Sequence, residues 1–181
     1  MTQITLLGSV DKMRLGVPKE PDSETRVAIV PSSLKKLLKS GFEVLVEKGA
    51  GISANYLDDE YESAGASIVS RKEVLACENV ICINFPGVED IAKNTNLVCV
   101  ADPFRNPNYV RECLAANITL MSMDMIPRRL SRAQSMDVNS SQDNLAGYKA
   151  VLLGAANVPK GIPMMTTSAG TVRPAKVVVM G

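Results

Sequence analysis

The sequence predicts an α/β protein with a Rossmann-like parallel sheet and helices on both faces, plus a linking helix and the first strand of a second dinucleotide-binding domain. Between residues 13 and 123, short apolar runs alternate with segments of helical periodicity, which is typical of parallel strands covered on both sides. One longer helical pattern follows, and a last β-branched run ends at Gly181.

The composition excludes several classes of protein. With 181 residues, 46% hydrophobic and 22% charged, the chain is long enough for one globular core, or for one domain and the start of another. A net charge of +1 and an aromatic share of 4% argue against binding to nucleic acid. No apolar run approaches the roughly 18 to 20 residues of a membrane helix, and residues 1–12 lack the pattern of a targeting peptide. We therefore expect residues 1–12 to be a short N-terminal extension.

Residues 13–138 are predicted to form the N-terminal α/β domain, which ends in a polar loop. The predicted strands are residues 13–17, 42–47, 66–69, 80–85, 97–101 and 118–123. The predicted helices are residues 34–39, 57–64, 71–76 and 110–116. Pro31 stands where the first helix can begin, and Ser32 or Ser33 is a candidate cap for it.

Residues 139–181 are predicted to hold the linking helix, a connector and the truncated start of an NAD-binding domain. Gly147 and Gly154 lie in the helical stretch, where each costs about 1 kcal/mol relative to Ala. Either the helix packs closely on a neighbour, or it ends near Gly154. Residues 159–174 form a Pro/Gly/Thr-rich connector, and residues 175–181 are a hydrophobic strand. A β-branched run reaching a glycine begins a dinucleotide-binding unit, although many other buried strands also end this way.

Cysteine and histidine usage limits the chemistry. The four cysteines show no C-x-x-C spacing, so we expect reduced, buried thiols. The chain has no histidine, which removes both the commonest metal ligand and the usual general base near neutral pH. We therefore predict no metal site.

The segment from Met125 to Tyr148 concentrates polar side chains. The candidate binding residues in it are Arg128, Arg129, Gln134, Asp137 and Ser140. Loops held by a rigid scaffold are where binding chemistry concentrates. From the residues alone, a ligand site and an Arg/Asp network that merely fixes a surface loop are about equally good interpretations.

Specific motifs match a known family. They are Gly-Val-Pro-Lys-Glu at 16–20, Arg-Val-Ala at 26–28, the run at 41–51, Ser-Arg-Ala-Gln-Ser-Met-Asp at 131–137, Asn-Leu-Ala-Gly-Tyr-Lys-Ala at 144–150, and the connector at 163–171. These segments resemble the N-terminal portion of the alanine dehydrogenase and proton-translocating NAD(P) transhydrogenase superfamily. The last two motifs before the connector resemble the NAD(H)-binding alpha subunit of the transhydrogenase. The likeness covers nearly everything after residue 12, and it is poor at about residues 88–110.

The resemblance implies roles for the polar loop, because in that family an Arg, a Gln and an Asp surround the nicotinamide. Gln134 and Asp137 take two of these places. Counting back from Gln134 makes the arginine Arg129, and counting forward from Pro127 makes it Arg128; Arg129 is the preferred choice. A guanidinium and an amide fix a carboxamide by directed hydrogen bonds, and Asp137 is placed to hold the arginine.

Two further cofactor contacts follow from the same resemblance. Ser140 corresponds to a serine near the nicotinamide carboxamide. Gly181 begins the turn that binds the dinucleotide.

The implied function is hydride transfer from NADH to NADP⁺, coupled to proton translocation. NAD is the cofactor on this side, and NADP is held by a partner subunit. The implied partners are the NADP(H)-binding subunit, the membrane subunit and a second copy in a homodimer. The implied location is a soluble domain peripheral to the membrane, on the cytoplasmic side in bacteria or the matrix side in mitochondria. We expect the chain alone to be inactive.

Two alternatives stay open. Alanine dehydrogenases of this superfamily use a Lys and a His, and neither residue stands in the corresponding runs 80–85 and 98–102. Because imine chemistry requires proton transfers, this activity is disfavoured. The other alternative is a non-catalytic Rossmann-like module for dimerisation or docking. Lys19, Glu20 and Arg26 are interpreted as structural charges at a strand end rather than as a ligand-facing cluster.

Overall fold

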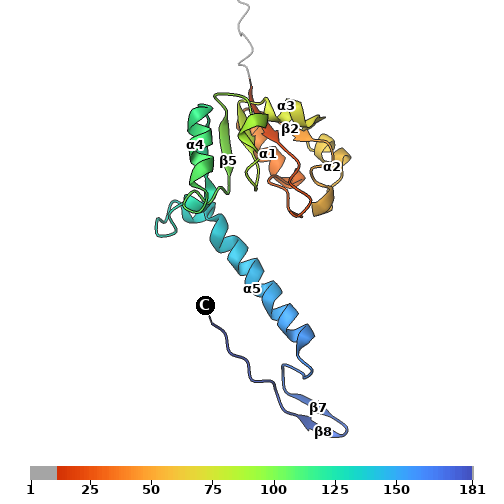
Figure 1. Cartoon of the computed structure of the whole chain (residues 1–181). Coiled ribbons are helices and arrows are strands. Elements are labelled where there is room, and N and C mark those ends of the chain that lie inside the picture. Colours follow the sequence, from red (N-terminus) through yellow and green to blue (C-terminus); the bar gives the residue numbers. More distant parts are fainter. Residues whose placement is uncertain (1–11, 181) are drawn as a thin grey trace, which may run out of the picture. The chain divides into compact units, whose positions relative to one another are not determined.

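The computed structural model describes residues 12–180, which form two compact units on either side of the bond between Ile126 and Pro127. We call residues 12–126 the sheet unit and residues 127–180 the helix unit (Figure 1). The N-terminal extension predicted for residues 1–12 lies outside the described residues except for Lys12, and Gly181 lies outside them too.

The sheet unit contains one six-stranded parallel sheet in the order β3-β2-β1-β4-β5-β6. Its strands are β1 (Met13–Val17), β2 (Phe42–Glu47), β3 (Ser67–Val69), β4 (Asn79–Ile81), β5 (Asn96–Cys99) and β6 (Thr119–Ser122). Its helices are α1 (Pro31–Lys39), α2 (Asp58–Ser63), α3 (Arg71–Leu75) and α4 (Pro107–Ala115), with short 3-10 turns at Ile52–Ala54, Val88–Asp90 and Met123–Met125. This strand order confirms the predicted Rossmann-like fold.

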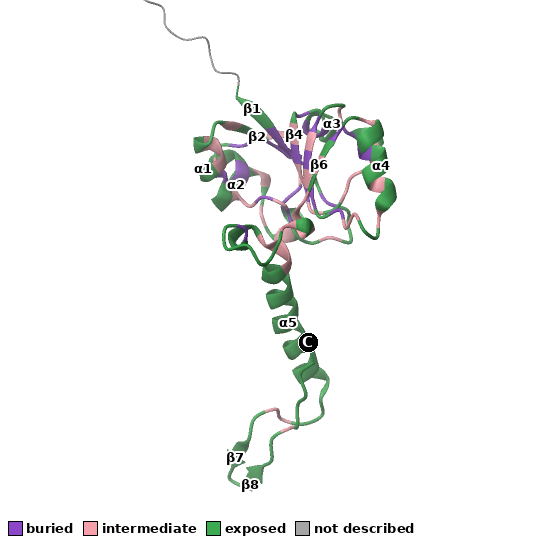
Figure 2. Cartoon of the chain, turned by 90° about the vertical axis from the view of Figure 1, so that its left-hand side faces the viewer, coloured by how far each residue is buried: buried purple, intermediate pink, exposed green. Residues whose placement is uncertain are grey.

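A separate hydrophobic core covers each face of the sheet. Successive side chains of a strand point to opposite faces, and β2 shows the result. Val44 and Val46 pack in the core that includes Leu34 of α1, whereas Leu45 packs in the core that includes Val74 of α3. The buried residues of both cores line the strands, coloured purple in Figure 2. The prediction that helices cover both faces is thus confirmed.

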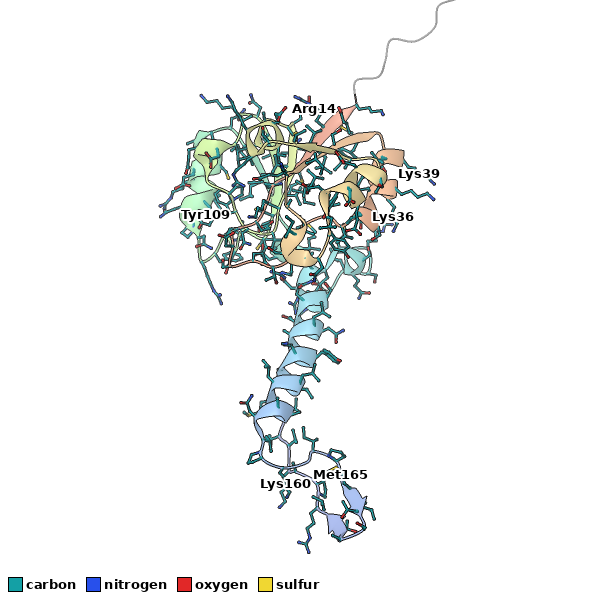
Figure 3. All side chains as sticks on the ribbon, turned by 90° about the vertical axis from the view of Figure 1, so that its right-hand side faces the viewer. Arg14, Lys36, Lys39, Tyr109, Lys160 and Met165 are labelled. Carbon is teal, nitrogen blue, oxygen red and sulfur yellow. The ribbon has the colours of Figure 1, made fainter. Side chains whose placement is uncertain are left out.

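Helix α1 shows how one element divides its residues between core and solvent. Leu34 is fully buried, while Lys36 and Lys39 are exposed and extend away from the fold (Figure 3). The helix begins at Pro31, and Val30 stands at the N-cap with no side-chain hydrogen bond, so the serine cap predicted from the sequence is wrong. Proline suits the first helical position because its missing N–H would have no partner there.

The four cysteines are free and buried, as predicted. Cys82 and Cys99 sit on neighbouring strands, and a hydrogen bond between the two thiols together with burial raises the pKa of Cys82. Burial raises the pKa of Cys77 and of Cys113 as well. The protonated thiols therefore serve as small core side chains.

Two predicted boundaries need correction. Strand β4 ends at Ile81, whereas the sequence predicted a strand to Phe85, because the backbone amides of Ile83 and Asn84 donate to the Glu20 carboxylate. Helix α5 (Val138–Asn157) begins six residues before the predicted start at Asn144. Its first turn is capped by Asp137, a residue the sequence assigned to the preceding loop.

The remainder of the helix unit also differs from prediction. The connector contains an antiparallel hairpin of β7 (Met165–Thr167) and β8 (Gly170–Val172), which the sequence analysis missed. Residues 173–180 form no helix or strand, so the strand predicted for 175–181 is not formed. A strand requires a hydrogen-bonded neighbour, and no other segment of residues 12–180 pairs with this one.

The helix-unit glycines do not support the close-packing explanation. A Cβ built on Gly147 or Gly154 meets no atom within 4 Å among the described residues. Helix α5 continues past Gly154 to Asn157. Across residues 12–180, no helix combines the length and apolarity that crossing a membrane demands.

We predict that Gly16→Ala destabilises the sheet unit by about 1–3 kcal/mol, because it overpacks a filled space. Gly16 lies on β1, and an added Cβ would collide with the backbone carbonyl oxygen of Val74 in α3. The measurement is urea unfolding of the sheet unit. The matched control is Gly147→Ala, which adds the same methyl group in open space. An unfolding midpoint for Gly16→Ala equal to that of the wild type would contradict the close approach of α3.

Candidate functional site

The sheet unit has a hollow where its strand order reverses. Strand β1 lies between β2 and β4, and the open edge beyond the carboxyl ends of such strands is where Rossmann-like sheets bind ligands. A cavity of about 280 Å³ lies there. Its lining consists of Pro18, Lys19, Glu20, Pro21, Asp22, Glu47, Arg71, Cys82, Asn84, Phe85 and Pro86.

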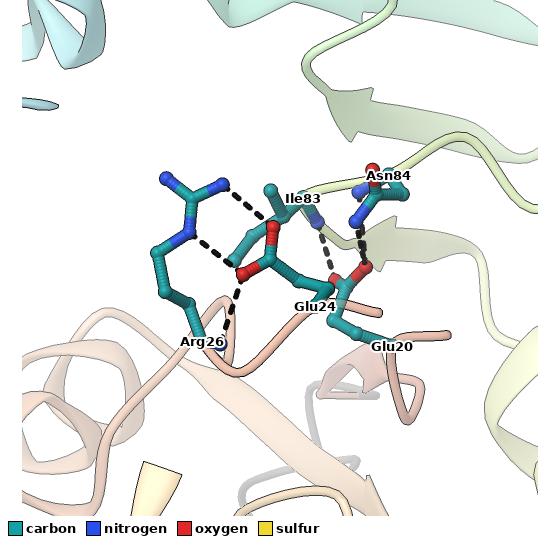
Figure 4. A network of polar contacts seen from close by, with 5 residues as sticks. All are labelled: Glu20, Glu24, Arg26, Ile83 and Asn84. Carbon is teal, nitrogen blue, oxygen red and sulfur yellow. Dashed lines mark hydrogen bonds and ion pairs between the residues drawn. The ribbon is translucent and has the colours of Figure 1, made fainter. Parts of the chain in front are cut away.

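Glu20 ties the end of β1 to the end of β4 (Figure 4). Its carboxylate is buried and accepts three hydrogen bonds, from the Ile83 amide at 2.5 Å, the Asn84 amide at 3.0 Å and the Asn84 side-chain nitrogen at 3.0 Å. These donors satisfy the buried charge, which would otherwise be costly. Glu20 and the Asn84 amide group are therefore committed to the fold.

Arg26 is held by Glu24 on the same side of the hollow (Figure 4). The Arg26 Nε–Glu24 Oε1 distance is 2.8 Å and the Nη2–Oε2 distance is 2.6 Å, which is a two-pronged pair. The hydrogen bonds from Arg26 lower the pKa of Glu24 to about 2. The Lys19 amide likewise donates to Glu47 at 2.7 Å. These contacts support the structural interpretation of Lys19, Glu20 and Arg26.

The polar loop of the helix unit brings Arg128 between two carboxylates. Its Nη2 lies 3.1 Å from Oδ2 of Asp143, and its Nε lies 3.9 Å from Oδ1 of Asp137. The first contact is a hydrogen bond, and the second is a looser ion pair. The sequence analysis expected an arginine beside Asp137, but it did not single out Asp143.

Asp137 is the N-cap of α5. One oxygen accepts from the Ser140 backbone amide at 2.9 Å, and the other accepts from the Ser140 hydroxyl at 2.6 Å. The pKa of Asp137 is lowered, first by the hydroxyl of Ser140, then by its amide, with a smaller contribution from Arg128. Asp137 and Ser140 thus start the helix and fix the end of the loop in one arrangement.

Gln134 and Arg129 differ from these residues. Both are exposed, and within residues 12–180 the side chain of neither makes a hydrogen bond or ion pair. Gln134 opens the 3-10 turn Gln134–Met136, and only its backbone is engaged. The structure therefore groups Arg128, Asp137 and Ser140, leaves the Gln134 amide available, and favours Arg128 over Arg129 as the partner of Asp137. Gly181 lies outside the described residues.

A signal for Asp143 is present in the sequence. It is the acidic residue of α5, and it follows a loop with three arginines. Carboxylates near a helix N-terminus are stabilised by the helix dipole and also attract a nearby guanidinium. Which arginine it would hold depends on the fold of the loop, so spacing alone does not reveal the pair.

Comparison with known proteins places the chain in a family. The family described as "Alanine dehydrogenase/PNT, N-terminal domain" matches residues 16–146. The chain belongs to this family. Over 180 residues it is 42% identical to the first of the polypeptides that make up the NAD(P) transhydrogenase subunit alpha of Rhodospirillum rubrum, an alignment that covers 93% of this chain and 47% of that polypeptide.

The solved structure of transhydrogenase from Sinorhizobium meliloti is similar at a TM-score of 0.85 and 37% identity, covering 90% of this chain and 50% of that one. The alanine dehydrogenase of Bacillus subtilis is 30% identical over 156 residues, covering 82% of this chain and 40% of that enzyme. The chain therefore spans about half the length, or less, of the relatives it matches.

We predict that the Glu24–Arg26 pair stabilises the sheet unit above pH 4.5 and that this contribution is lost as the pH falls to about 2. The sign follows from the lowered pKa, since acid protonates the unfolded carboxylate before the folded one. We expect a contribution of about 1 kcal/mol, because solvent screens a half-exposed guanidinium. The measurement is the unfolding free energy of wild type and Glu24→Gln from pH 6 to pH 2. Parallel curves for the two proteins would refute the contribution of this pair.

Proposed function

We propose that the chain belongs to the NAD(H)-binding alpha subunit of a proton-translocating NAD(P) transhydrogenase, where it supplies the loop beside the nicotinamide. The observation that carries the proposal is the loop of the helix unit, in which Arg128 is held by two carboxylates next to an unengaged Gln134 amide. The likeness to transhydrogenase subunits supports the same assignment.

The free groups of this loop suit a nicotinamide carboxamide. A carboxamide has one carbonyl acceptor and two N–H donors, and the Gln134 side chain offers the complementary set. The Arg128 side chain is 52% exposed, so it retains accessible N–H donors after its ion pairs are made. The residues present therefore fit the ring substituent of NAD.

The proposed mechanism depends on orientation. NAD, when bound, supplies the hydride chemistry. Arg128 and Gln134 would orient the ring substituent, while Asp137 and Ser140 keep the loop in a single arrangement. Transfer between two nicotinamides exchanges no proton at either ring, so a site without histidine suffices. The gain in rate comes from holding the reacting groups in a productive geometry.

A specific observation disfavours alanine dehydrogenase activity. The hollow at the strand edge is where the sequence places the superfamily's lysine-bearing strand end, and here that end carries Asn84. The Asn84 side chain donates to Glu20, and Arg26 is paired with Glu24. The groups that would bind and protonate an amino or oxo acid are thus absent or already engaged.

The proposal extends to cofactors and partners. NAD would bind this subunit and NADP a partner subunit, with the assembly completed by a membrane subunit and a second copy of this chain. Exposed apolar side chains on α5, such as Leu145, Tyr148 and Val151, support association with another protein surface. The side of the membrane would be the cytoplasm in bacteria or the matrix in mitochondria.

We predict that Gln134→Ala lowers hydride transfer from NADH to NADP⁺ by about 10- to 100-fold in the assembled transhydrogenase, with a far smaller effect on NADH affinity. The reason is that Gln134 orients the ring while other regions of the dinucleotide provide most of the binding. Stopped-flow transfer rates and NADH titration of the same preparation measure the two effects. Turnover equal to wild type would remove Gln134 from the site.

We also predict that Arg128→Ala reduces the transfer rate at least as strongly, whereas Arg129→Ala has little effect. The difference follows from the contacts, because the carboxylates of Asp137 and Asp143 hold Arg128, and Arg129 has no such partner in the described chain. The two variants remove the same charge from adjacent positions and serve as each other's control. The opposite ranking of rates would assign the role to Arg129.

A further inference from the structure

We propose that Asp143 is a positioning residue, whose carboxylate sets the orientation in which Arg128 meets the nicotinamide. This inference rests on the proposed function and adds to it a residue outside the Arg, Gln and Asp implied by the family resemblance. Asp143 would act through Arg128 and would not itself touch the ligand.

The first argument is the division of labour between two carboxylates. Both oxygens of Asp137 are occupied by Ser140, at 2.9 Å from its amide and 2.6 Å from its hydroxyl. At 3.9 Å, the contact of Asp137 with Arg128 is too long for a hydrogen bond. Asp143 makes that hydrogen bond, at 3.1 Å from Nη2. Direct control of the guanidinium plane therefore belongs to Asp143.

The second argument is electrostatic. Arg128 contacts the N-cap residue of α5, where the helix dipole presents partial positive charge and repels a cation. The lowered pKa of Asp137 shows that this carboxylate stays ionised, but its charge also serves the helix cap. A second carboxylate from within the same helix compensates for the repulsion and keeps Arg128 at this end of α5.

The third argument concerns exposure. The side chains of Arg128 and Asp143 are 52% and 70% exposed, and ion pairs this accessible contribute little to stability. A backbone hydrogen bond or an apolar contact would serve to fix the loop, yet the chain uses a carboxylate on the next turn of α5. The effect of Asp143 should therefore appear in the geometry of Arg128 rather than in folding.

The experiment is a double-mutant cycle on the chain within the assembled transhydrogenase. We expect Asp143→Asn to lower the rate of hydride transfer at saturating NADH by roughly tenfold, as partners that orient a functional group commonly do. In an Arg128→Ala background, Asp143→Asn should cause no further loss, because its effect passes through Arg128. Asp143→Glu should restore some of the lost rate. The control is Asp59→Asn, which removes an exposed carboxylate from α2.

A second measurement does not depend on activity. In ¹⁵N-labelled protein, a guanidinium held by a carboxylate rotates slowly about its Nε–Cζ bond and gives separate Nη resonances. We expect Asp143→Asn to average these resonances for Arg128 and to leave the melting temperature within about 2 °C of wild type. The Arg128 signals are assigned from their loss in Arg128→Lys.

The outcomes separate the two proposals. If wild type transfers no hydride from NADH to NADP⁺, the proposed function fails, while the resonances still report whether Asp143 holds Arg128. Unchanged resonances in Asp143→Asn, or an equal loss of rate with and without Arg128, would overturn the positioning role. Wild-type turnover in Asp143→Asn would overturn it as well.

Discussion

The structure depends on one constraint, which is that a parallel sheet must bury both of its faces. Each central strand therefore serves two cores at once, with Val44 and Val46 on one side of β2 and Leu45 on the other. Gly16 satisfies the same constraint on β1 by leaving room for the backbone of α3. Because all six strands run in the same direction, their carboxyl ends lie along one edge, and the loops that follow β1 and β4 meet there.

Charge is used differently at the two candidate sites. At the strand edge, Glu20 and Glu24 are bound by nearby donors, so the polar groups of the hollow hold the fold together. In the helix unit, carboxylates hold Arg128, yet half of its side chain stays exposed and the Gln134 amide has no partner within residues 12–180. A ligand finds unsatisfied, preorganised donors at the second site and few at the first. This contrast separates ring orientation from proton-transfer chemistry within one family.

Local sequence pattern predicts the fold well where neighbouring residues decide it. The bounds of β1 and β2 follow from their apolar runs and agree with the structure at both ends. Pattern fails where a distant residue decides, as when Glu20 takes the amides that would have prolonged β4. It also fails for the hairpin at Met165–Val172, whose short strands lack an apolar face. The choice between Arg128 and Arg129 belongs to this second class, since only folding of the loop shows which guanidinium meets Asp143.

The double role of Asp137 has a consequence for heat inactivation. The same carboxylate begins α5 and anchors Ser140, so fraying of the first helical turn also releases the loop. Helix ends open far more readily than the interior of a two-core sheet. The transfer rate should accordingly decay at temperatures where the sheet is still intact, and it should recover on cooling.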